Sequence, residues 1–274
     1  MSNLASRVGS FGRTKIVGAI FADDFNGSSV DATRWQGPYD RRGDVNNNEL
    51  QAMVPANVVI GSSLLTITAK HETVTAADRD EAAPHNSNVG TAAGTSGSYD
   101  YTSGQVMTVK SFLYGTITCR FKPPAGSGAW PLFWLLGSNW DKQLYTANQI
   151  GANWPVGAWC EADIAEFGNF ARTIVNCESH FTTGNRGPGM ETLPYDASSR
   201  FMVYRLEWSP GSMVWSVDPE DGSGFQVLGS VSGDAVPPFA QYIVLSMAVG
   251  GFGGTPNPAD YPLVAQYDYV RVTQ

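Results

Sequence analysis

Three carboxylates, Glu161, Asp163 and Glu166, lie close together in the segment 159–167, which otherwise has the alternating pattern of a buried strand. In a regular strand successive side chains point to opposite faces, so Glu161 and Asp163 share one face while Glu166 falls on the other. A β-bulge adds one residue to a strand and returns the next side chain to the first face, and bulges often re-aim side chains beside active sites. We therefore predict a bulge near Ala165.

Three carboxylates on one strand face cannot all ionise easily, because neighbouring negative charge and partial burial raise the pKa of the group that keeps its proton. One acid then stays protonated while another stays charged, as hydrolysis of a glycosidic bond requires. Retention of configuration needs the two carboxyl groups about 5 to 5.5 Å apart and inversion about 6.5 to 9.5 Å, and the strand spacing permits both. The alternative, a solvated acidic edge strand, does not require a hydrophobic opposite face.

The segment 161–166 resembles the ExDxxE signature of glycoside hydrolase family 16, in the bulged form found in endo-β-1,3-glucanases (laminarinases) and in agarases. Further blocks similar to this family occur in the same order over nearly the whole chain, at residues 21–27, 47–51, 114–123, 130–134, 204–208 and 268–272. A lone ExDxxE motif is weak evidence, but the ordered set is specific. The resemblance implies that Glu161 is the nucleophile, Glu166 the general acid/base and Asp163 the residue that positions or tunes them.

The composition favours an all-β protein of one domain. Of its 274 residues only 15% are charged, and 30 Gly and 16 Pro suit short strands joined by turns. The resemblance implies a β-jelly-roll sandwich of two antiparallel sheets with a concave substrate cleft, formed by residues 19–274 after an N-terminal extension, 1–18. Residues 101–107 and 114–122 are expected to pair as two strands around Ser111 and Phe112.

Two tryptophans, Trp130 and Trp134, are spaced four residues apart on one face of an expected strand. Their flat apolar rings with a polar edge suit stacking against a pyranose. The alternative is core packing, since Trp is highly buried on average. The family resemblance favours stacking for Trp134, whereas the two interpretations are more evenly balanced for Trp130.

Four more side chains are candidates for sugar binding. Asn47 lies in a block that the resemblance assigns to the cleft, although a turn role is equally plausible. His180 lies on the polar face of an expected strand beside the acids, with a structural role as the alternative. Gln105 and Phe252 stand where laminarinases commonly carry Arg and Trp. Both replacements keep part of the recognition chemistry but leave the preferred glycan open.

A structural calcium site is implied only by the resemblance. Asp24, Asp268 and a carbonyl near Gly61 occupy positions similar to the calcium ligands of the family. Oxygen ligands are what calcium accepts. Without the resemblance, these would be ordinary strand-end residues.

The net charge of −8 disfavours nucleic acid as a partner, because binding a phosphate backbone depends on clustered Lys and Arg. No apolar run approaches the roughly 20 residues of a membrane span, and residues 1–18 lack the hydrophobic stretch of a secretory signal. We expect a monomer that acts outside the cell, as a polysaccharide substrate requires. Cys119, Cys160 and Cys177 fall on apolar strand positions and are expected to be small buried side chains, although a Cys160–Cys177 bridge is an alternative.

The sequence thus predicts a retaining endo-glycoside hydrolase that cleaves laminarin-type β-1,3-glucan or mixed-linkage β-glucan. Within the enzyme class, the alternatives are a galactanase acting on agar or porphyran and a transglycosylase, because the ExDxxE spacing does not separate them. Outside it, the alternative is a jelly-roll lectin, which would use the aromatic residues but has no need of opposed carboxylates.

Overall fold

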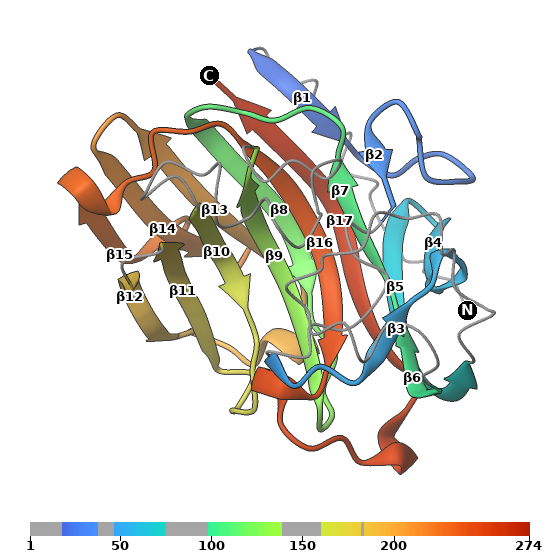
Figure 1. Ribbon diagram of the computed structural model, residues 1–274. Helices are drawn as coiled ribbons and strands as arrows, with labels where there is room; N and C mark the ends of the chain where they lie inside the picture. The colour runs from blue at the N-terminus through green and yellow to red at the C-terminus, as the bar shows by residue number, and fades with distance from the viewer. Residues whose placement is uncertain (1–17, 38–46, 75–97, 139–159, 182–183) are drawn as a thin grey trace, which may run out of the picture.

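Strands form almost all the regular structure of the computed structural model, which describes residues 18–37, 47–74, 98–138, 160–181 and 184–274 (Figure 1). They make two sheets. Ten strands form the first: β1 (Ala19–Asp23), β3 (Gln51–Met53), β4 (Val58–Gly61), β5 (Leu64–Val74), β6 (Tyr99–Ser103), β8 (Gly115–Lys122), β13 (Met202–Ser209), β14 (Ser212–Asp218), β15 (Gln226–Ser232) and β17 (Leu263–Thr273). Seven form the second: β2 (Trp35–Gln36), β7 (Gln105–Thr108), β9 (Ala129–Gly137), β10 (Cys160–Glu166), β11 (Ile174–Phe181), β12 (Gly184–Thr192) and β16 (Gln241–Val249).

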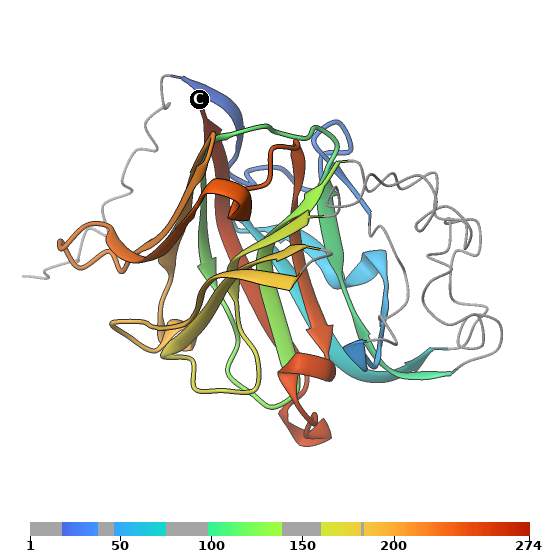
Figure 2. The same cartoon turned by 60° about the vertical axis from the view of Figure 1, so that its left-hand side comes forward.

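The two sheets pack face to face as a sandwich, as Figures 1 and 2 show. The ten-stranded sheet runs β15-β14-β13-β8-β17-β5-β6-β3, with β1 beside β17 and β4 beside β5, and the seven-stranded sheet runs β12-β11-β10-β9-β16-β7-β2. Described strand pairs are antiparallel except β3 with β6, which is parallel. The predicted all-β sandwich of two sheets is therefore confirmed, with this one parallel exception.

The core lies between the sheets because each strand turns alternate apolar side chains inward. In β8 the inward positions Ile117, Cys119 and Phe121 are fully buried, and in β16 the inward side chains Ile243 and Leu245 meet the opposite sheet. The expectation of small buried thiols is confirmed, since Cys119, Cys160 and Cys177 are all buried and free. No described helix is long and apolar enough to cross a membrane.

The expected pairing of residues 101–107 with 114–122 is wrong. The chain breaks at Gly104, so that β6 joins the ten-stranded sheet and β7 joins the seven-stranded one. A side chain at Gly104 would place its Cβ 2.6 Å from Val58 Cγ2, so the close approach of η2 (Pro55–Asn57) and β4 at this corner requires glycine. β8 pairs instead with β13 and β17.

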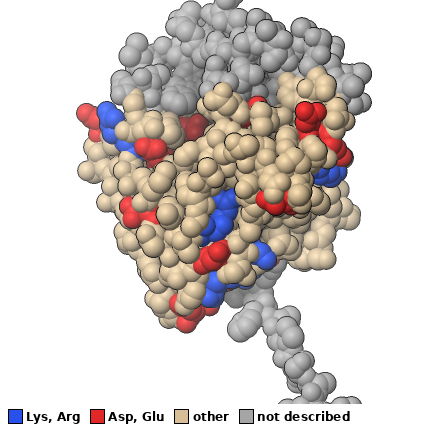
Figure 3. Space-filling model, turned by 90° about the horizontal axis from the view of Figure 1, so that it is seen from below, with Lys and Arg blue, Asp and Glu red and all other residues tan. Residues whose placement is uncertain are grey.

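Charges on the described surface are mixed. On the face shown in Figure 3, acidic and basic side chains are scattered among uncharged residues. Arginines of the ten-stranded sheet are paired with acids, as in Arg120–Glu220 at 2.8 Å and Arg205–Glu207 at 2.9 Å. Such pairs neutralise basic groups locally.

Candidate active site

The acidic strand β10 contains the predicted bulge. Against β11, Asp163 lies opposite Glu178 and the next pair is Glu166 with Asn176, so two residues of β10 face one of β11. Against β9 the register also shifts between Asp163 and Ala165. Both residues of the bulge, Ile164 and Ala165, are buried in the core between the sheets. Glu166 is thereby returned to the face of Asp163, on the side of the sheet that points away from the core.

Both carboxylate oxygens of Glu166 accept a hydrogen bond. The Trp130 indole donates its Nε1–H to Oε1 at 2.8 Å, and the Asn176 amide donates from Nδ2 to Oε2 at 2.6 Å. Burial, followed by the charge of Asp163, raises the pKa of Glu166 to about 8 despite these two donors. Glu166 therefore carries a proton at neutral pH, as a general acid must.

His180 links the acidic strand to β12. Its Nε2 lies 2.9 Å from Asp163 Oδ2 and its Nδ1 lies 2.8 Å from Asn185 Oδ1. Burial lowers the pKa of His180, but the hydrogen bond and negative charge of Asp163 outweigh it and raise the value to about 10. The ring is therefore a cation that donates to both neighbours.

Glu161 completes the group. One ligand atom from each of Glu161, Asp163 and His180 lies within 4.8 Å of the other two. Burial and the nearby charge of Asp163 raise the pKa of Glu161 well above its usual value, while the charge of His180 acts in the opposite direction. The histidine cation thus offsets part of the rise and helps Glu161 to reach the ionised form that a nucleophile needs.

The chain matches the family model of the glycosyl hydrolases family 16 over residues 52–262. It belongs to glycoside hydrolase family 16. It is 29% identical to a beta-glucanase of Rhodothermus marinus over 275 residues, which cover 92% of this chain and 84% of the relative. An endo-1,3-1,4-beta-glycanase of Rhizobium meliloti is 27% identical over 88% of this chain, which spans about half of that protein (48%). Among solved structures, the catalytic domain of an endo-1,3-beta-glucanase (laminarinase) from Thermotoga petrophila matches with a TM-score of 0.73 and 25% identity, covering 93% of this chain and 97% of that one.

In this family 16 hydrolase, three candidate substrate-binding residues come together beside Glu166. Trp130 is partly exposed, and its ring meets Phe252 edge-on with 5.7 Å between the centroids. Phe252 lies in the turn η7 (Gly251–Gly253), directly after β16. The Asn47 carbonyl approaches this turn so closely that a Cβ at Gly251 would lie 2.3 Å from its oxygen. Glu166, Trp130, Phe252 and Asn47 thus form one corner of the site.

Trp134 and Gln105 are more enclosed. Trp134 is 6% exposed and packs with Met107, Leu132, Leu136 and Val244, while its Nε1 donates to Ser246 Oγ at 2.9 Å. Gln105 is 5% exposed and is paired through its backbone with Ser246. Trp134 is the strand partner of Asp163, so its ring lies on the face of the acids and outside the core between the sheets. A sugar contact there stays a proposal.

The sequence did not assign roles to Asn176 and Asn185, the amide partners of the site. Asn176 shares the polar face of β11 with His180, so the alternation of this strand could have identified it. Asn185 is brought to His180 by the register of β12 against β11, where the two residues are direct partners. That register cannot be predicted from the local sequence.

Two metal positions can be compared. The group Glu161, Asp163 and His180 could hold a metal ion, although the histidine would first have to lose a proton. Of the residues expected to bind calcium, Asp24 Oδ1 lies 2.8 Å from Arg271 Nη2, and Asp268 Oδ2 lies 3.1 Å from Arg120 Nη1. A calcium ion would compete with both arginines.

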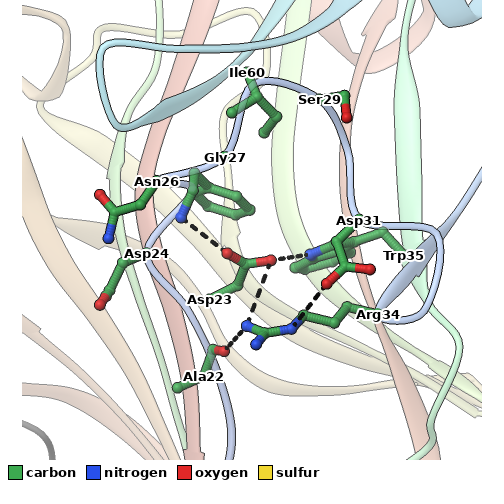
Figure 4. A pocket seen from close by; sticks show the side chains of 11 residues that line it. Ala22, Asp23, Asp24, Asn26, Gly27, Ser29, Asp31, Arg34, Trp35 and Ile60 are labelled. Carbon is green, nitrogen blue, oxygen red and sulfur yellow. Dashed lines mark hydrogen bonds and ion pairs between the residues drawn. The ribbon is translucent and has the colours of Figure 1, made fainter.

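The surroundings of Asp24 are shown in Figure 4. A pocket of about 410 Å³ lies beside it and beside Ile60, the neighbour of Gly61. Inside the pocket, Asp23 accepts from the Phe25 amide and the Trp35 indole, both at 2.9 Å. Figure 4 shows Asp24 apart from this hydrogen-bonded network.

Proposed function

We propose that this family 16 hydrolase is a retaining endo-β-1,3-glucanase. The observation that carries the proposal is the bulge in β10, which places Glu166 on the face of the other acids while Trp130 and Asn176 hold its two oxygens. Two carboxyl groups on one face, one that keeps its proton at neutral pH and one beside the His180 cation, suit a double displacement. The names of the R. marinus and T. petrophila relatives support a β-glucan as the substrate.

In the first step, Glu166 gives its proton to the glycosidic oxygen while the Glu161 carboxylate attacks the anomeric carbon. The bond to the leaving sugar breaks and a glycosyl-enzyme ester forms. Glu166 is then a carboxylate, which the N–H groups of Trp130 and Asn176 stabilise. In the second step it removes a proton from water, the water oxygen attacks the anomeric carbon, and Glu161 leaves as the carboxylate. The proton on Glu166 is thereby restored.

Replacement of Glu161 by Gln tests the nucleophile. We expect Glu161→Gln to lower kcat on laminarin by more than about 10⁴-fold, because the amide cannot form the ester, and to leave the fold intact. Glu207→Gln is the matched control, because Glu207 lies on β13 of the other sheet, paired with Arg205. Circular dichroism checks the fold and release of reducing ends measures turnover. Substantial turnover by folded Glu161→Gln would exclude this assignment.

The preferred glycan is the second part of the proposal. We favour β-1,3-glucan of the laminarin type, with mixed-linkage β-glucan as a second candidate because the R. meliloti relative is named as an endo-1,3-1,4-beta-glycanase. Agar-type galactan and transglycosylation remain alternatives. Release of reducing ends from laminarin, lichenan, agarose and xyloglucan separates the substrates, and binding without any product would instead indicate a lectin. The product anomer, followed by proton NMR, separates retention from inversion.

The remaining proposals follow from a polysaccharide substrate. A monomer acting outside the cell suits an insoluble or very long glycan, and size-exclusion chromatography with cell fractionation tests this. A calcium ion near Asp24, Gly61 and Asp268 also stays a proposal, supported only by the family resemblance. Unfolding temperatures with and without a chelator would reject it if they are equal.

A further inference from the structure

We propose that Arg172 is a positioning residue that fixes the acid/base Glu166 by tying together the chain segments on both sides of the Trp130–Glu166 hydrogen bond. This inference rests on the proposed function, because it assigns a role within that reaction. Arg172 lies between β10 and β11 and is 8% exposed.

The guanidinium of Arg172 is surrounded by backbone carbonyls. Its Nε donates to Pro124 O at 2.9 Å, Nη1 to Gly168 O at 2.8 Å and Nη2 to Ala129 O at 3.1 Å. These acceptors follow β8, follow β10 and begin β9, so one side chain joins three segments. Burial lowers the pKa of Arg172 to about 10 while the charge of Asp196 opposes this, so the group is a cation at neutral pH.

Two of the three carbonyls belong to residues that lie close in sequence to Trp130 and Glu166, the partners of the hydrogen bond that holds the acid. Ala129 precedes Trp130, whose indole donates to Glu166, and Gly168 follows Glu166 by two residues. The guanidinium therefore holds the backbones of both partners of the 2.8 Å bond between Trp130 Nε1 and Glu166 Oε1. A shift of either segment would change the direction in which the acid presents its proton.

The three hydrogen bonds of Arg172, which we call the Arg172 clamp, also support Phe252 beside Trp130. A Cβ at Gly168 would lie 2.6 Å from the Phe252 ring, and the backbone N–H of Asn169 donates to Phe252 O at 2.7 Å. The segment that Arg172 holds at Gly168 is thus the one on which Phe252 rests. Phe252 in turn packs edge-on against Trp130.

Only arginine has the geometry for this role. Its planar guanidinium sends N–H groups in fixed directions to three separate acceptors, whereas the lysine ammonium is a single point of charge on a flexible stem. Arg172→Lys therefore keeps the positive charge and removes the N–H groups that point to the three carbonyls. The matched control is Arg205→Lys, because Arg205 lies on β13 of the opposite sheet and pairs with Glu207.

The test compares two leaving groups, because general-acid help matters for a sugar alcohol and hardly at all for dinitrophenolate. We expect Arg172→Lys to lower kcat/KM on a reduced laminari-oligosaccharide by about 10- to 100-fold, the size of effect that a misplacement of about 1 Å produces. On dinitrophenyl β-laminaribioside the loss should stay within about threefold. Arg205→Lys should match the wild type on both substrates.

A double variant adds a second measurement. In a Trp130→Phe background the hydrogen bond is already absent, so Arg172→Lys should cost much less activity than it does in the wild type. Equal losses on both substrates, no loss, or additive effects with Trp130→Phe would each overturn the proposal. Arg172→Gln replaces Arg172→Lys if the latter does not fold, and failure of both to fold would make Arg172 a folding residue and also overturn it.

The outcome can be separated from that of the proposed function. A wild-type protein that cleaves neither substrate rejects the glucanase assignment. The clamp is then judged from a crystal structure of Arg172→Lys, in which an unchanged bond between Trp130 and Glu166 would contradict it. A wild type that cleaves both substrates while Arg172→Lys equals it rejects the clamp alone.

Discussion

Glu166 shows how single side chains set the chemistry of this site. Burial and Asp163 favour its protonated form, whereas the donors Trp130 and Asn176 favour its carboxylate. The reaction needs both forms in turn, first an acid and then a base. A pKa of about 8 lies between the two requirements, so proton release to the leaving sugar and proton uptake from water are both accessible near neutral pH.

This balance predicts a pH dependence. In the wild type, kcat/KM should fall above about pH 8, as Glu166 loses the proton that it must donate. Asn176→Leu removes a donor that stabilises the charged form, so the pKa of Glu166 rises and the alkaline limb moves to higher pH. Trp130→Phe should shift it in the same direction. pH profiles of kcat/KM measure this, and a shift to lower pH in either variant would contradict it.

At the scale of the strand, the number of residues between Asp163 and Glu166 decides which face of β10 carries Glu166. It thereby decides whether Glu166 can act. Deletion of Ala165 leaves an uninterrupted strand in which Glu166 still falls on the face of Glu161 and Asp163. Deletion of both Ile164 and Ala165 turns Glu166 toward the core between the sheets. We expect the first variant to keep measurable hydrolysis of laminarin and the second to lose both activity and several degrees of thermal stability.

The two deletions control for each other, since both shorten β10 at the same place. Activity that falls in simple proportion to the number of residues removed would contradict the prediction that the face carrying Glu166 decides activity. Circular dichroism and thermal unfolding show whether each variant has kept its fold.

The bulge in β10 could be predicted because the spacing of Glu161, Asp163 and Glu166 in the local sequence shows which of them alternation places on one face. The break at Gly104 could not be predicted, because the close approach of Val58 to this glycine joins segments far apart in sequence. In the same way, the three carbonyls around Arg172 come from separate segments, and how these approach one another depends on the whole sandwich. Family resemblance named the acids, but the groups that orient them are set by contacts between segments far apart in sequence.

At the scale of the whole molecule, the ten-stranded sheet supports the acids through the core. The Trp215 indole of β14 donates to the Asp163 carbonyl at 2.8 Å, and the Tyr267 hydroxyl of β17 lies 2.9 Å from the Leu132 carbonyl on β9. The sandwich therefore supplies the rigidity that holds carboxylates together against their repulsion, and that repulsion should lower the stability of the whole domain.

Stability should accordingly depend on the charge of Glu166. Its pKa is raised from 4.5 to about 8 in the folded protein, so its contribution is fully present below about pH 4.5 and is lost as the pH rises through about 8. Glu166→Gln removes this titration, because the amide stays neutral and Asn176 can turn to accept its N–H.

The variant should thus unfold at a higher temperature than the wild type at pH 9, by about 2 to 4 °C for each kcal/mol gained. At pH 5 the difference should shrink, and Glu207→Gln should show no such trend, as thermal unfolding at the two pH values can measure. If Glu166→Gln raises the unfolding temperature equally at pH 5 and pH 9, then the charge of Glu166 does not destabilise the folded protein, and this prediction is wrong.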